Sequence, residues 1–131
     1  MKPEGFTGLL TDYIEGRRDK PFAWGANDCV TFSMDWVKHM RGKDPIADLR
    51  GKWQDAPSAA RVIDSLGGLL AETDRRFKRI DQAFAQRGDI VAFSVNGHLG
   101  LYVCRGTHAV GPGLDEMMLI SMRDAVAAWE S

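Results

Sequence analysis

The chain of 131 residues carries a net charge of −1, with 44% hydrophobic and 27% charged residues. This balance is that of an ordinary globular protein with one core. It disfavours a general nucleic-acid binder, which needs a basic face to displace phosphate counterions. No apolar stretch has the length of a signal peptide or a membrane span. We therefore expect one domain over residues 1–131 that is cytoplasmic when synthesised and binds neither nucleic acid nor a membrane.

The N-terminal half of the chain shows helical patterns. Helices are predicted over residues 5–18, 28–41, 57–66 and 69–76, with a loop over 20–27 and an irregular stretch over 43–56. Asp28 suits the N-cap of the second helix, because its carboxylate can accept hydrogen bonds from N–H groups of the first turn. Gly42 suits the end of that helix.

Strand patterns begin near residue 88. Strands are predicted over residues 88–95, 97–104, 107–110 and 117–122. Asn96-Gly97 between the first two strands is a strong hairpin signal. Residues 123–130 are expected to close as a short helix that packs Trp129 onto the core. Helices followed by an antiparallel meander predict an α+β domain.

Cys29 falls in the first turn of the second predicted helix. Unpaired N–H groups and the helix dipole favour negative charge there, which promotes the thiolate form that acts as a nucleophile. The carboxylate of Asp28 partly opposes this effect, so a neighbouring imidazolium is needed to complete the activation. A buried apolar core residue is the alternative interpretation of the same cysteine. Cys104 is expected to be a packing residue, and two cysteines do not make a disulfide framework.

His98 is the candidate base among the three histidines. His39 lies too far from Cys29 along the same predicted helix to reach it. His98 opens the second predicted strand, and Gly100 leaves room on the face that the two residues share with Tyr102.

A third polar group that orients the imidazole would assist a cysteine–histidine pair. His108 is the leading candidate, with Asp115 as a weaker one. The turn before His108 decides the matter, since a two-residue turn puts His98 and His108 on opposite faces and a turn longer by one residue puts them on the same face.

No metal or cofactor is predicted. The cysteines and histidines lack the short CxxC and HxxxH spacings that are typical of zinc sites. The chain also lacks GxxxxGK[ST], GxGxxG after a strand, and the GxSxG elbow. Nucleophilic catalysis by Cys29 therefore remains open beside the interpretation of this cysteine as a packing residue.

Three blocks follow one another along the chain, namely Phe22-Ala-Trp-Gly-Ala-Asn-Asp-Cys29, Arg87-Gly-Asp-Ile-Val-Ala-Phe93 and Gly97-His-Leu-Gly-Leu-Tyr-Val103. As an ordered set they resemble the NlpC-type cell-wall peptidases, a branch of the papain-like cysteine hydrolases. Thr107-His108-Ala109 follows where that family often has a His-Ala step. Residues 42–53 and the closing Ala-Ala-Trp129 are more similar to a narrower group of small phage and prophage proteins found among tail genes.

The resemblance implies a papain-like fold, with one hydrolase domain over residues 1–131. It implies Cys29 as nucleophile, His98 as base and His108 as the orienting partner. The expected reaction is hydrolysis of an amide in peptidoglycan stem peptides through an acyl-enzyme. Trp24, Asp28 and Tyr102 lie in or beside the matched positions and are the expected substrate-binding residues.

Two other functions remain open at this point. One is a non-catalytic tail assembly module that keeps the fold, since Val30-Thr31 follows the cysteine where the family often has Ser-Gly. The other is an acyltransferase or deamidase of the same architecture. Expected partners are the peptidoglycan peptide and other phage tail proteins. Delivery by a phage tail or release by lysis would bring the protein to the cell wall.

Overall fold

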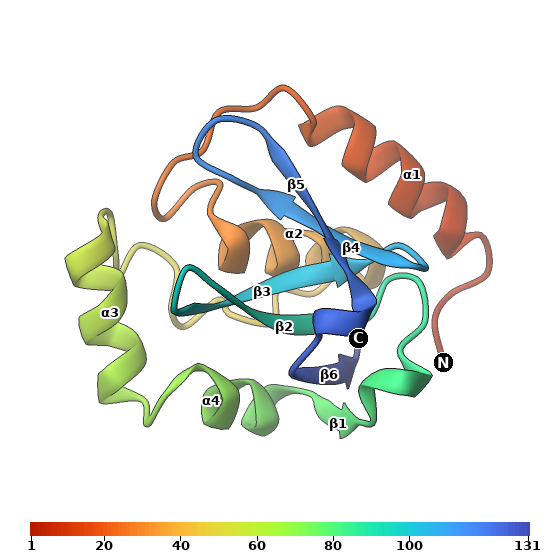
Figure 1. Cartoon of the computed structure of the whole chain (residues 1–131). Helices are drawn as coiled ribbons and strands as arrows, with labels where there is room; N and C mark the ends of the chain where they lie inside the picture. Colours follow the sequence, from red (N-terminus) through yellow and green to blue (C-terminus); the bar gives the residue numbers. More distant parts are fainter.

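The computed structural model describes all residues, 1–131, as four helices followed by a six-stranded sheet (Figure 1). The helices are α1 (Phe6–Arg17), α2 (Cys29–Arg41), α3 (Ala56–Ser65) and α4 (Leu69–Arg76). The strands are β1 (Lys78–Ile80), β2 (Ile90–Val95), β3 (His98–Cys104), β4 (His108–Pro112), β5 (Met117–Ser121) and β6 (Ala127–Glu130). Short 3₁₀ turns lie at Gln82–Phe84 and Met122–Asp124. The α+β prediction is confirmed.

The start of α2 is fixed by a capping box. Asp28 accepts a hydrogen bond from the backbone N–H of Thr31, and the Thr31 hydroxyl accepts one from the backbone N–H of Asp28. These two bonds satisfy donors that the helix itself leaves unpaired. Gly42 ends the helix with φ 76°, a conformation that glycine adopts without strain. Both predicted ends of this helix are confirmed.

The sheet has the order β1-β6-β2-β3-β4-β5, and every neighbouring pair is antiparallel. The predicted meander is confirmed as β2-β3-β4-β5. Asn96 and Gly97 both have positive φ, 52° and 80°, as a two-residue hairpin turn requires.

The expected terminal helix over residues 123–130 is wrong. After a short 3₁₀ turn, β6 forms and pairs with both β1 and β2. The alanines of β6 favour a helix by propensity, but the free edges of two strands outweigh that preference. Trp129 is nevertheless fully buried, as predicted.

Alternation along the strands divides the core between the two faces of the sheet. Ile90, Ala92, Leu101 and Val103 belong to the cluster that α1, α2 and α3 cover. Val91, Phe93, Tyr102 and Cys104 belong to a second cluster on the opposite face. Helix α2 packs against β3, and α1 packs on α2 (Figure 1). None of these helices has the length and apolar character needed to cross a membrane.

Candidate active site

Cys29 is the first residue of α2, half-buried, and it packs against the cluster that contains Tyr102. Its Sγ atom lies 3.0 Å from the position that a Cβ atom would take on Gly100. A Cβ atom at position 100 would therefore crowd the sulfur more closely than most Cβ contacts in proteins, and glycine avoids this because it has no side chain. The cysteine at the helix start and the glycine of the predicted Gly-His-Leu-Gly strand therefore meet in space.

Asp28 holds the loop before Cys29 in place. Its Oδ1 accepts the Thr31 N–H at 2.8 Å, and its Oδ2 accepts the Gly25 N–H at 2.8 Å and the indole N–H of Trp53 at 2.7 Å. The side chain is 2% exposed, and donors within the protein occupy both of its oxygens. Asp28 is therefore a positioning residue, and the expectation that it binds substrate finds no free oxygen to support it.

The thiol of Cys29 is protonated at neutral pH. Burial, followed by the neighbouring Asp28 carboxylate, raises its pKa to about 11. The backbone N–H groups of Leu101 and Val30 act in the opposite direction, because they donate toward the sulfur and favour the thiolate. Without an imidazolium in contact with the sulfur, the helix start does not by itself produce a thiolate.

Tyr102 lies beside Cys29. Its hydroxyl oxygen is 3.2 Å from the same Cβ position on Gly100, and its ring lies over Gly111 on the neighbouring strand, 2.5 Å from a Cβ position there. Burial and the nearby Cys29 raise the pKa of its hydroxyl to about 12. The hydroxyl makes no hydrogen bond within the protein, so it remains a free donor next to the sulfur.

His98 is the first residue of β3 and lies opposite Val95 across the hairpin. It shares a strand face with Gly100 and Tyr102, two residues along the strand from the glycine that Cys29 contacts, or about 7 Å of strand rise. Its ring is exposed and makes no hydrogen bond. The structure thus places His98 on the same side of β3 as Cys29 and leaves the imidazole free to turn.

His108 does not join this group. β3 and β4 pair Val103 with Val110 and Cys104 with Ala109, so a two-residue turn puts His108 on the sheet face opposite His98. The histidine also lies at the other end of β3, exposed, with its Nδ1 3.0 Å from the Thr107 hydroxyl. The prediction that His108 orients the imidazole of His98 is therefore corrected.

Two tryptophans lie close to the start of α2: Trp24 in the loop that precedes Cys29, and Trp53, which is bonded to Asp28. Trp24 is 40% exposed and packs edge-on against Phe22, with ring centroids 5.0 Å apart. Trp53 lies in the irregular stretch over 43–56, where no sequence pattern indicates the bond that its indole N–H makes to Asp28. No cluster of three or more histidine, cysteine or acidic side chains is placed to hold a metal ion.

One family matches the whole chain. Its description is a domain of unknown function, DUF6950, and the match covers residues 1–131. A comparison with curated proteins gave no match.

Proposed function

The chain belongs to the DUF6950 family, a domain of unknown function, and we propose that it is a cysteine hydrolase of the NlpC-type papain-like fold. In this proposal Cys29 is the nucleophile and His98 is the base. The contact between the Cys29 sulfur and Gly100 carries the proposal, because it joins the first residue of the helix to the strand face of His98. The resemblance of the three sequence blocks supports the same roles.

The raised pKa of Cys29 determines how the reaction would begin. Because the thiol is neutral at pH 7, His98 would remove its proton as the sulfur attacks the amide carbonyl. The backbone N–H of Cys29 would help to stabilise the oxyanion. Protonated His98 would then give the proton to the leaving amine as the C–N bond breaks. Water would hydrolyse the resulting thioester and release the acid.

The proposed substrate is an amide bond in peptidoglycan stem peptides, reached from a phage tail or after lysis. This step rests on the sequence resemblance. The free hydroxyl of Tyr102 supports it, since it offers a hydrogen-bond donor beside the sulfur. Trp24 precedes Cys29 by five residues and exposes 40% of its surface, on which a substrate could pack.

A non-catalytic tail module is the second candidate. Two observations favour it: the pKa of Cys29 is raised to about 11, and the His98 ring makes no hydrogen bond. An inert, half-buried thiol would account for both. The two candidates differ in whether the sulfur reacts with a substrate.

Release of amines from purified peptidoglycan tests the proposal. Cys29→Ala should abolish release, whereas Cys104→Ala should retain it, because Cys104 is fully buried, pairs with Ala109 and lies four residues along β3 from the Gly100 position that Cys29 approaches. Circular dichroism and thermal unfolding would verify that both variants fold. Unchanged release by Cys29→Ala would refute catalysis by this residue, and no release by the wild-type protein would favour the tail module. Mass analysis of the products separates hydrolysis from acyl transfer.

A further inference from the structure

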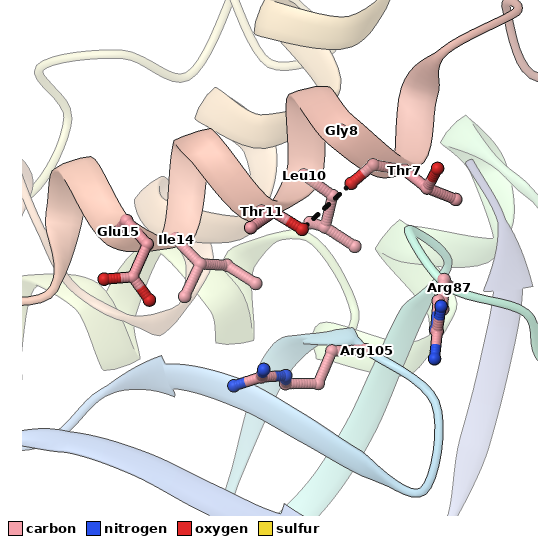
Figure 2. Close-up of a pocket in the computed structure, with 8 residues that line it drawn as sticks. All are labelled: Thr7, Gly8, Leu10, Thr11, Ile14, Glu15, Arg87 and Arg105. Atoms are coloured by element: carbon pink, nitrogen blue, oxygen red, sulfur yellow. Dashed lines mark hydrogen bonds between the residues drawn. The ribbon is translucent and has the colours of Figure 1, made fainter.

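A groove separates α1 from the end of the sheet where β3 turns into β4 (Figure 2). Its volume is about 390 Å³. Leu10 and Ile14 of α1 contribute aliphatic surface, and the polar residues that line it are Thr7, Thr11, Glu15, Arg87 and Arg105. The groove lies at the opposite end of β3 from His98 and shares no residue with the candidate active site.

Arg87 and Arg105 are the unusual feature of this groove. Neither guanidinium makes a hydrogen bond or an ion pair in the structure, whereas Arg17, Arg50 and Arg76 each bind a carboxylate. An arginine keeps its charge at every physiological pH and presents a rigid fork of N–H donors. The groove therefore holds two positive charges whose donors are unused.

The other groups of the groove leave the donors of both arginines unpaired, although Arg105, after Arg18, contributes to lowering the pKa of Glu15. Glu15 is the acidic residue in the lining, and Nη2 of Arg18 already binds its carboxylate at 2.6 Å. The Thr11 hydroxyl donates to the Thr7 carbonyl at 3.1 Å, the dashed line of Figure 2. The Thr7 hydroxyl makes no hydrogen bond and remains a free donor toward an anion.

The two guanidinium groups lie toward different ends of the groove. In Figure 2, Arg87 lies toward Thr7 and Arg105 lies toward Ile14 and Glu15. The side chain of Arg87 packs beside the turn between β3 and β4, because its Nε lies 3.4 Å from the position that a Cβ atom would take on Gly106. A ligand with a single anionic group would leave one of the arginines unpaired.

We propose that this groove binds a small dianion whose two anionic groups stand apart, one on Arg87 and one on Arg105. Carboxylate and phosphate both match the guanidinium fork, so the ligand is a dicarboxylate or a diphosphate. The Thr7 hydroxyl would donate a further hydrogen bond at the Arg87 end, and Leu10 and Ile14 would contact the aliphatic part of the ligand. This binding is independent of the reaction proposed for Cys29.

Nuclear magnetic resonance titration of the ¹⁵N-labelled protein tests the proposal. Succinate and pyrophosphate are added separately at constant ionic strength, and the arginine Nε–H signals and the amide signals of Thr7 and Gly106 are followed. Both probes should give saturable shifts at these signals, and the tighter of the two identifies the preferred anionic group. Arg87→Gln and Arg105→Gln should each weaken binding about tenfold, as expected for one charge-assisted contact.

Arg61→Gln is the matched control, since Arg61 is another exposed arginine without a partner and lies on α3, away from the groove. It should leave the dissociation constant unchanged. Three results would overturn the proposal: no saturable shift with either probe, equal weakening by Arg61→Gln, or acetate binding as tightly as succinate. Because Arg87 and Arg105 have no internal partner, their variants should unfold at the wild-type temperature, so a loss of binding is not a loss of folding.

Discussion

The Sγ atom of Cys29 stands 3.0 Å from where a Cβ atom would lie on Gly100, and Cε2 of Tyr102 is equally close to that point. Gly100→Ala would force a methyl group between the sulfur and the ring. We expect it to lower the free energy of unfolding by about 1–3 kcal/mol, the usual cost of overpacking. The displaced sulfur should also react more slowly with iodoacetamide at a fixed high pH.

Gly16→Ala is the control for that substitution. Gly16 lies in α1 with open space around its Cβ position, so alanine should stabilise the helix by up to about 1 kcal/mol. Urea unfolding measures both variants. Equal stabilisation by the two alanines would contradict the close approach of Cys29 to β3.

The hydrogen bond from the Trp53 indole N–H to Asp28 should contribute to the stability of the fold. Trp53→Phe removes the indole N–H and leaves the buried Oδ2 with the Gly25 N–H as its remaining donor. We expect a loss of about 1–3 kcal/mol in stability, the cost of under-satisfying a buried polar group. Trp24→Phe should cost less, because its ring is partly exposed and its N–H has no partner. Thermal unfolding compares the two variants, and equal losses would count against the Asp28 bond.

The capping role of Asp28 was accessible from the sequence, and the role of its second oxygen was not. A helix cap depends on residues three positions apart, which a single sequence displays directly. One donor to Oδ2 is Trp53, whose position within the irregular stretch gives no pattern from which the direction of its side chain could be inferred. Contacts of this kind are set by tertiary packing.

Among the strands, too, local features were predictable from the sequence and features set by tertiary packing were not. The hairpin at Asn96-Gly97 was predictable because turn chemistry is local. β1 and β6, of three and four residues, are too short to show an alternation that distinguishes strand from helix. The face of His108 depended on the length of one turn, and the sequence allowed both lengths.

The raised pKa of Cys29 predicts how the free thiol reacts with pH. At neutral pH almost no thiolate is present, so the iodoacetamide rate should rise about tenfold per pH unit and level off only near pH 11. Asp28→Asn should move this plateau to lower pH, because the carboxylate charge is the second cause of the raised pKa. A plateau below pH 7 in the wild-type protein would instead indicate a thiolate–imidazolium pair.

Alkaline pH should destabilise the fold. Folding raises the pKa of Cys29 to about 11 and that of Tyr102 to about 12, so the unfolded chain releases these protons first as pH rises. The free energy of unfolding should be insensitive to both groups below their unfolded pKa values and should fall between about pH 9 and 12. Cys29→Ala should flatten the first part of that decline. Urea unfolding across this range measures the decline. An identical slope of unfolding free energy against pH in the variant would show that folding does not raise the pKa of the Cys29 thiol.

His98 and His108 lie on opposite faces of the sheet, so their substitutions should affect catalysis differently. If His98 is the base, His98→Ala should lower amine release from peptidoglycan by about 10²–10⁴-fold, the usual contribution of a positioned general base. His108→Ala should change it by less than about twofold, because the register of β3 and β4 holds this histidine on the other face of the sheet. Both residues are exposed, so neither variant should unfold earlier than the wild-type protein. Comparable losses in the two variants would mean that His108 supports the reaction despite its position, and retained activity in His98→Ala would remove His98 from the proposed pair.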